Sequence, residues 1–337
     1  TDEHRAGPQR TWPPRLRRTP RLHLPLAPPA GRPANGVNSA FMFLKPHASH
    51  RAVHQFARGL LEEAGVRVVE EGSISAERIA QRRAIDVHYG SLASKALDSQ
   101  PADLLVQPEA QKAFEAAFGF SWGDALARGL VCNAIGAMER LGCSAEELDE
   151  KWTPLQLGEG KVKFGGGFYC GHIEGIFVIN GFYMAMRSQY VTPGNSVQWF
   201  ALEWDSAELP WKTFREEVLG STDPVHAAAR SLRGAVHRDW QKLGLAGPPH
   251  VGENVVHASA SPFEALVERM NWLCLRVHQD PFGSALLDGG IKLDTVQHWA
   301  SDPIVSHVGR RQSLFDLFEN RDSLECLELA LALQQRR

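Results

Sequence analysis

The stretch Asn254-Val-Val-His257-Ala-Ser-Ala-Ser261-Pro-Phe-Glu264-Ala-Leu-Val-Glu268 predicts a short strand that turns at once into a helix. Two adjacent valines precede His257, and β-branched residues favour a strand. Ser261 is a helix-capping residue followed by a proline, and Glu264 stands three residues after the cap. These start signals predict a helix that runs to about residue 278, and they place His257 at the end of the last strand.

Upstream of this stretch, the chain alternates between strand and helix patterns. Residues 39–45 form a short apolar run that ends at Pro46, as a buried strand would. Residues 49–64 place apolar side chains at helical spacing and end at a glycine, and residues 66–69 alternate as a second strand. Residues 75–97 are rich in Ala, Arg and Gln and predict another helix. The order strand, helix, strand, helix indicates an α/β fold.

The middle of the chain loses this alternation, and we expect a helical insertion at about residues 98–170. Its glycine-rich segment is interpreted as a flexible joint rather than a phosphate-binding loop, because no Lys-Ser or Lys-Thr follows the glycines. The expected elements from here on are helices over 108–118 and 122–141, a turn at 164–168, a helix over 176–190, a turn at 192–195, a strand over 197–204 and short helices over 210–218 and 224–232.

The last part of the chain predicts a helical C-terminal extension over residues 281–337. Its leucines recur at spacings typical of a packed helical face, so we expect a role in packing or subunit contact. The predicted domains are therefore a tail over 1–36, a main domain over 37–280 that contains the insertion, and this extension.

The composition is that of an ordinary globular protein. Hydrophobic residues make up 43% of the 337 residues and charged residues 22%, and the formal net charge of -3 gives no overall attraction to nucleic acid. No run approaches the roughly 18 apolar residues of a membrane-spanning helix. Five cysteines without a Cys-x-x-Cys pair argue against a disulfide framework or a structural zinc site, and we expect an intracellular, cytoplasmic protein.

Residues 1–36 carry seven arginines and eight prolines without helical or strand periodicity. We expect a disordered or extended tail. An arginine-rich, acid-poor start is also typical of an organelle import sequence, although the prolines disfavour the amphipathic helix of a mitochondrial one. Nucleic-acid binding through this tail is a weaker hypothesis, because the arginines lack an aromatic stacking platform.

His257 is the strongest candidate for chemistry among the 14 histidines. It ends a strand, small residues follow it, and the next helix carries Glu264 and Glu268 one turn apart. A nucleophilic imidazole needs space for an incoming group, a nearby hydroxyl and a carboxylate that orients the other ring nitrogen. The segment that follows His257 can provide all three.

Several motifs in the same order make the sequence resemble the nucleoside diphosphate kinase family. They are the family's Asn-x-x-His-x-Ser signature, the Lys-Pro pair at the end of its first strand, the His-Tyr pair of its second helix, and its Leu-Gly-x-Thr-x-Pro and Arg-Gly motifs. The matching residues are Asn254-Val-Val-His257-Ala-Ser259, Lys45-Pro46, His88-Tyr89, Leu219-Gly-Ser-Thr222-Asp-Pro224 and Arg233-Gly234.

This resemblance implies a ferredoxin-like βαββαβ core, with an antiparallel sheet covered by helices. It implies phosphoryl transfer between nucleoside triphosphates and diphosphates in a homo-oligomer, with Mg²⁺ held mainly through the nucleotide phosphates and not by a protein metal site. Carried over residue by residue, it makes His257 the phosphorylated residue, oriented by Glu268 and supported by Ser259. The implied nucleotide contacts are Lys45, Tyr89, Thr222, Arg233 and Asn254.

The chain also departs from the family pattern. Family members are about half as long, so the resemblance covers roughly residues 39–97 and 176–278. The family arginine six residues before the threonine falls on Glu216, with Arg215 beside it. The base-stacking phenylalanine of the family lies in the interrupted region. The candidates for it are Phe177 and Phe182.

Two hypotheses from different classes follow. The first is an active nucleoside diphosphate kinase that works by ping-pong transfer. The second is a catalytically weak relative, kept as a structural or nucleotide-sensing subunit of a larger assembly that docks through the insertion and the C-terminal helices. Glu216 and the extensions favour the second hypothesis. The residues that favour the first are His257, Glu268, Lys45 and Arg233.

Overall fold

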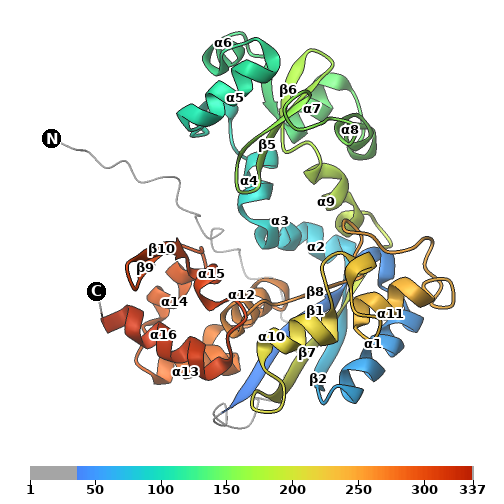
Figure 1. The fold of residues 1–337 in the computed structure, drawn as a ribbon, viewed down its shortest axis with the longest axis vertical. Coiled ribbons are helices and arrows are strands. Elements are labelled where there is room, and N and C mark those ends of the chain that lie inside the picture. Colours follow the sequence, from blue (N-terminus) through green and yellow to red (C-terminus); the bar gives the residue numbers. More distant parts are fainter. Residues whose placement is uncertain (1–35, 336–337) are drawn as a thin grey trace.

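The computed structural model describes residues 36–335. The predicted disordered tail lies outside the described residues except for its last position. Figure 1 shows three parts: a sheet with its covering helices, an insertion lobe (residues 98–182) above it, and a C-terminal unit (residues 281–335) beside it.

The main sheet contains the four strands that the sequence predicts. Its order is β2-β7-β1-β8, and every neighbouring pair is antiparallel. In the pairing of β1 with β8, Phe43 lies opposite His257. The second strand is longer than predicted, and the last begins two residues later. The bounds are β1 (Val37–Leu44), β2 (Arg67–Ser75), β7 (Ser196–Asp205) and β8 (Val256–Ala258).

β1 is buried on both faces, which explains its unbroken apolar run. Met42 and its alternate neighbours face one core together with α1 (Arg51–Glu63) and α11 (Leu232–Asp239). Phe41 and Phe43 face the other core, which includes Trp272 of α12 (Pro262–Trp272). Side chains that alternate along the strand therefore join both helical layers to one sheet.

The predicted helix over 75–97 is instead three short helices, because the backbone bends at two places. Arg83 adopts a left-handed conformation with φ of 52°, and Gly90 has φ of 36° and ψ of -96°. Neither conformation continues a right-handed helix. The helices are α2 (Ala76–Arg82), α3 (Ala84–Tyr89) and α4 (Ser91–Leu97).

The insertion lobe contains a second sheet, so the prediction of a helical insertion was wrong. Its order is β3-β6-β5-β4. The run Ile176-Phe-Val-Ile179, predicted as the start of a helix, is a fully buried strand; a short apolar run of β-branched residues suits either state. The glycine-rich segment is the turn between β4 and β5, where Gly167 has φ of 61°. The strands are β3 (Val131–Asn133), β4 (Lys161–Gly165), β5 (Phe168–Ile173) and β6 (Ile176–Ile179).

Helices surround this second sheet. The predicted helix over 108–118 is present as α5, whereas the one over 122–141 is divided by β3. The capping box of Ser144 and Glu147, which starts α8, is a sequence signal that the predictions missed. The helices are α5 (Pro108–Phe118), α6 (Trp122–Ala127), α7 (Ala134–Leu141), α8 (Ala145–Trp152) and α9 (Tyr183–Val191).

The C-terminal unit has a hydrophobic core of its own, to which α12 contributes Phe263 and Leu266. It includes a two-stranded hairpin that the helical prediction missed. Its elements are α13 (Pro281–Asp288), α14 (Leu293–Trp299), β9 (Ile304–His307), β10 (Arg310–Ser313), α15 (Leu314–Phe318) and α16 (Ser323–Gln335).

Several short helices complete the chain. The predicted helix over 224–232 is only a single 3₁₀ turn, and α11 begins after the cap Ser231. The predicted helix to residue 278 ends at Trp272, because Cys274 is left-handed with φ of 58°. The short elements are η1 (Pro46–Ala48), η2 (Pro101–Asp103), α10 (Trp211–Thr213), the π-helix η3 (Phe214–Leu219), η4 (Pro224–His226) and η5 (Val277–Gln279).

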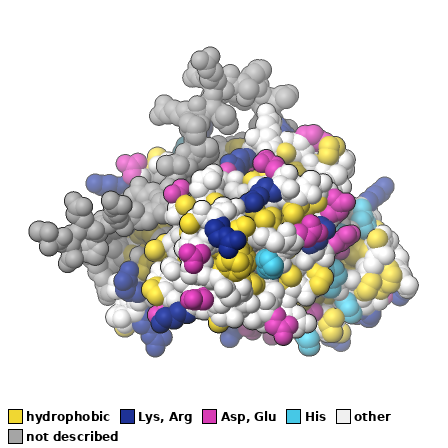
Figure 2. Space-filling view, turned by 90° about the horizontal axis from the view of Figure 1, so that it is seen from above, with side chains coloured by type: hydrophobic (Ala, Val, Ile, Leu, Met, Phe, Trp, Pro, Cys, Tyr) yellow, Lys and Arg dark blue, Asp and Glu magenta, His cyan; other side chains and the backbone are white. Residues whose placement is uncertain are grey.

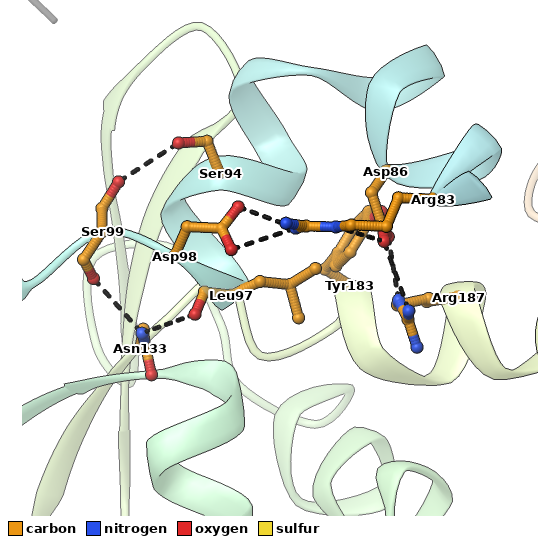
Figure 3. A network of polar contacts seen from close by, with 9 residues as sticks. All are labelled: Arg83, Asp86, Ser94, Leu97, Asp98, Ser99, Asn133, Tyr183 and Arg187. Atoms are coloured by element: carbon orange, nitrogen blue, oxygen red, sulfur yellow. Dashed lines mark hydrogen bonds and ion pairs between the residues drawn. The ribbon is translucent and has the colours of Figure 1, made fainter. Parts of the chain in front are cut away.

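A buried carboxylate joins α3, which precedes the insertion lobe, to α9, which follows it (Figure 3). Asp86 of α3 accepts hydrogen bonds from the Tyr183 hydroxyl at 2.7 Å and from Arg187 Nε at 2.8 Å, both on α9. Arg83 Nε lies 3.3 Å from the same carboxylate, and Arg83 Nη2 reaches Asp98 at 2.8 Å. These bonds fix the two chain segments that enter and leave the lobe.

The surface of the lobe carries mixed charge. In the view from above, acidic and basic side chains are interspersed among apolar ones (Figure 2). Among residues 36–335, no helix combines the length and the apolarity that crossing a bilayer requires.

We predict that Asp86→Ala lowers the free energy of unfolding by about 3 kcal/mol, because it leaves buried donors without their acceptor. Urea denaturation measures this change. The matched control is Asp103→Ala in the exposed η2 position, which should stay within about 0.5 kcal/mol of wild type. Equal effects of the two substitutions would contradict the assigned role of Asp86.

Candidate functional site

His257 lies on β8, the edge strand next to β1, and its ring packs at 5.0 Å from the ring of Phe43 on β1. Its Nε2 atom lies 2.5 Å from Glu268 Oε1. The imidazole is 23% exposed, so one side of the ring is open to solvent. The other nitrogen, Nδ1, has no hydrogen bond to any residue in the described part of the chain.

Glu268 is itself held in place. It is buried on α12, and its second oxygen, Oε2, lies 2.6 Å from the Ser259 hydroxyl. Ser259 is fixed in turn, because its hydroxyl accepts a hydrogen bond from the backbone N–H of Phe41 at 3.1 Å. The orientation of the imidazole is therefore set by contacts that lead back to the central strand.

A second histidine, His88 of α3, completes the buried part of the site. Its ring stands nearly perpendicular to that of His257, with centroids 4.5 Å apart, and its Nδ1 atom lies 3.5 Å from Glu268 Oε1. Sequence reasoning used His88 only as half of a motif and assigned it no role. Its position next to Tyr89 in that motif was the available signal.

Burial keeps both imidazoles neutral. It lowers the pKa of His257 to about 4; Glu264 opposes this shift, whereas the positive charges of Lys45 and Arg233 add to it. Burial also lowers the pKa of His88 to about 3. A neutral His257 ring has a lone pair on one nitrogen, which a nucleophile requires.

Burial acts in the opposite direction on the neighbouring carboxyl groups. It raises the pKa of Glu268 to about 7, against the opposing effects of His88 and of the Ser259 hydrogen bond. Burial and the nearby Glu268 raise the pKa of Glu264 to about 7, while its Oε2 accepts the backbone N–H of Ala260 at 2.8 Å.

Two predicted cationic residues, Lys45 and Arg233, lie close to His257. Lys45 follows β1, and burial together with the charge of Arg233 lowers its pKa to about 8. Arg233 of α11 donates to the carbonyls of Gly220 at 2.6 Å and Val256 at 2.9 Å, and Val256 is the residue before His257. Residues from three distant parts of the chain thus meet around one imidazole.

Arg215, not Glu216, belongs to this group. Burial, together with the charge of Arg215, lowers the pKa of Arg233 to about 10. The charge of Arg215 also contributes to the low pKa of His257. The Glu216 side chain is 63% exposed and lies 3.9 Å from Lys212. Both residues lie in the π-helix η3, whose extra residue per turn shifts the register of its side chains relative to an α-helix. Arg215 is on the side of the site, whereas Glu216 is largely exposed to solvent.

The other predicted contacts differ in their surroundings. Asn254 is buried and donates to the Thr222 carbonyl at 3.0 Å, while its own Oδ1 is buried and has no hydrogen-bond partner among residues 36–335. Thr222 is exposed. Tyr89 packs against His88, with ring centroids 5.0 Å apart, and burial raises its pKa. These residues can border a ligand that enters beside His257.

The two candidates for base stacking are wrong. Phe177 is 2% exposed in the core of the insertion lobe, among the rings around Phe114. Phe182 packs against Trp152 in the same lobe. Both belong to the second sheet and its helices, a feature that the sequence reading missed.

The described residues contain one group of three side chains with metal-ligand spacing, His88, His257 and Glu268. Two of its three ligands are imidazoles, which suit transition metals, whereas Mg²⁺ prefers oxygen ligands. The donor set therefore does not fit a protein-held Mg²⁺.

Comparisons with known proteins were made by sequence and by structure. No family model matches the chain. The nucleoside diphosphate kinase of Archaeoglobus fulgidus is 30% identical over 142 residues, which are 42% of this chain and 75% of that protein. Its sequence match is the basis for a family assignment.

Two solved nucleoside diphosphate kinase structures are also similar. The match to the Encephalitozoon cuniculi enzyme, in its apo cubic crystal form, has a TM-score of 0.33 at 14% identity. It covers 70% of this chain and 88% of that enzyme. The match to the Pyrobaculum aerophilum enzyme has a TM-score of 0.31 at 14% identity. It covers 70% of this chain and 95% of that enzyme.

We predict that the His257 ring stays neutral between about pH 5.5 and 8, because its pKa is depressed below the ordinary value near 6.5. Since the unfolded residue titrates near 6.5, its contribution to stability is fully present above that pH and is lost as the pH falls toward about 4. An NMR titration, with the signal identified by His257→Gln, measures this. A midpoint near 6.5 would contradict the assignment.

Proposed function

The chain belongs to the nucleoside diphosphate kinase family, and we propose that it transfers the γ-phosphoryl group of a nucleoside triphosphate to a nucleoside diphosphate through a phosphohistidine on His257. One observation carries this proposal. His257 has a neutral ring whose Nε2 is held by Glu268, while Nδ1 is unbonded among the described residues and three cationic side chains lie nearby.

In the first half-reaction, His257 Nδ1 attacks the γ-phosphorus. The nitrogen–phosphorus bond forms as the bond from that phosphorus to the bridging oxygen breaks, and this oxygen keeps the electron pair on the departing diphosphate. The ring gains positive charge, which the hydrogen bond from Nε2 to Glu268 stabilises. The proton on Nε2 stays in that hydrogen bond.

Lys45, Arg233 and Arg215 supply the positive charge that phosphoryl transfer needs, because the reaction places negative charge on the equatorial and leaving oxygens. In the second half-reaction, a terminal oxygen of a bound diphosphate attacks the same phosphorus. The bond to Nδ1 breaks, and the electron pair returns to the imidazole. The two steps give ping-pong kinetics.

We also propose Mg²⁺ as a companion of the nucleotide. When bound to the phosphates it would neutralise charge that the protein cations leave uncompensated. The protein residues that would share those phosphates are Lys45 and Arg233.

The observed sheet order supports a ferredoxin-like βαββαβ core. In this interpretation, β1, α1 and β2 form one half, and β7, α11 and β8 form the other. The main domain over residues 37–280 is then interrupted between its halves by the insertion lobe. We propose that the insertion extends to about residue 182, beyond residue 170, because the second sheet includes β6.

The alternative is a catalytically weak subunit of a larger assembly. The insertion lobe favours it, because this lobe adds surface that phosphoryl transfer does not use. Glu216 no longer supports it, since Arg215 lies on the side of the site. Sustained turnover by a purified homo-oligomer would distinguish the kinase from this alternative.

We predict that incubation with γ-labelled ATP and Mg²⁺ leaves acid-labile, base-stable label on the protein. His257→Gln should abolish the label, because the attacking nitrogen is lost. The matched control is His278→Gln, which changes an exposed histidine and should keep the label. An unlabelled wild-type protein would overturn the proposed function.

A second prediction concerns Ser259→Ala. The substitution removes a hydrogen bond that favours the ionised Glu268, so the pKa of Glu268 should rise above about 7. Less carboxylate is then ionised at pH 7, and labelling should slow by about fivefold there and recover as the pH rises. Rapid-quench labelling from about pH 6 to 9 measures this. An unchanged pH dependence would exclude the assigned role of Ser259.

A further inference from the structure

Arg215 is held by residues from outside the main domain. Its Nη1 atom donates to Glu319 Oε1 at 2.7 Å and to Asn320 Oδ1 at 2.6 Å. The two bonds use both hydrogens of Nη1, and Nη2 and Nε have no bonds to other residues in the range 36–335. One edge of the guanidinium is therefore fixed, while the remaining N–H groups can meet another acceptor.

The turn that holds Arg215 is anchored beside the nucleophile. The backbone N–H of Asn320 donates to the Ala260 carbonyl at 2.9 Å, and Ala260 follows His257 by three positions. Asn320 itself has φ of 60°, a left-handed conformation that asparagine tolerates better than most residues. Through this turn, the position of Arg215 is tied to the end of the strand that carries His257.

A second set of bonds fixes the helix on which Arg215 stands. Asp322 Oδ1 accepts the backbone N–H of Trp211, the first residue of α10, at 2.7 Å. The same oxygen accepts Asn38 Nδ2 at 2.6 Å, and the Ser323 N–H donates to Asn38 Oδ1 at 2.9 Å. The segment over 319–323, here named the clamp, thus touches the beginning of this helix, its arginine and β1.

We infer that the clamp positions Arg215 for the phosphate groups of the nucleotide, with Asn320 as the principal positioning residue; this inference rests on the proposed function. An arginine side chain loses much rotational freedom when it orders on a ligand, and the clamp has restricted this one beforehand. The Arg215–Glu319 pair alone is a weak reason for the contact, since Glu319 is 45% exposed and such pairs contribute little to stability.

The consequence is that the C-terminal unit takes part in substrate binding. The C-terminal unit is then a component of the phosphate site, although none of its residues carries out chemistry.

The test uses the full chain and compares Asn320→Gly, Asn320→Asp and Arg215→Ala. Glycine keeps the left-handed backbone and removes the acceptor, whereas aspartate keeps an acceptor oxygen. For His257 labelling with ATP and Mg²⁺, Asn320→Gly should raise KM about threefold to tenfold at nearly constant kcat, and Asn320→Asp should restore KM. Arg215→Ala should raise KM by tenfold or more.

The double variant decides between positioning and mere packing. If Asn320 acts through Arg215, adding Asn320→Gly to Arg215→Ala should change KM no further. Independent effects in the double variant, or an unchanged KM in Asn320→Gly, would overturn the inference. Glu216→Gln, on the same helix, is the control and should leave KM unchanged.

Failure of the proposed function would be recognised separately. If the wild type takes no label, the kinase proposal fails, and the clamp is tested by calorimetric binding of ADP with Mg²⁺. Weaker ADP binding by Asn320→Gly than by Asn320→Asp would still support the clamp, whereas equal or undetectable binding by wild type and both variants would overturn it.

Discussion

The hydrogen bond between His257 Nε2 and the Glu268 carboxylate is the interaction on which the rest of the site depends. It joins the edge strand of the main sheet to the helix that follows, and it determines which imidazole nitrogen is left for a reaction. Its burial has two opposite effects, because a low dielectric keeps the ring neutral and also makes the carboxylate costly to ionise. The Ser259 hydroxyl, His88 and Arg269 offset part of that cost, because each favours the ionised carboxylate.

The main sheet was largely predictable from the sequence, because its strands are short apolar runs with clear ends and the helix after His257 has strong start signals. The convergence of Lys45, Arg233 and His257 came from the family resemblance and could not follow from spacing alone. The run at 176–179 was misjudged because a short apolar segment fits a strand or a helix. Arg83 in a left-handed conformation and the π-helix around Arg215 have no simple sequence signature, since both depend on tertiary contacts.

The extra length of the chain is used in two different ways. The insertion lobe has its own sheet and core, and it is joined to the rest of the chain by an apolar cluster that it shares with Ala93 and Ala96 of α4 and by the polar contacts around Asp86. The C-terminal unit instead packs along α12 and reaches the residues beside His257. The insertion lobe supplies none of the site residues described above, whereas the C-terminal unit supplies Glu319 and Asn320, which contact Arg215.

α12 belongs to three hydrophobic cores at once: Trp272 packs in the core with Phe41 and Phe43, Ala265 packs in the core with Met42, and Phe263 and Leu266 pack into the C-terminal unit. Glu268 lies between these residues on the same helix. A change in the packing of α12 against the C-terminal unit would therefore also displace the Glu268 carboxylate, which contacts His257. A substitution in the core of the C-terminal unit that repacks Phe263 or Leu266 would accordingly reach Glu268 through this shared helix, without touching that carboxylate directly.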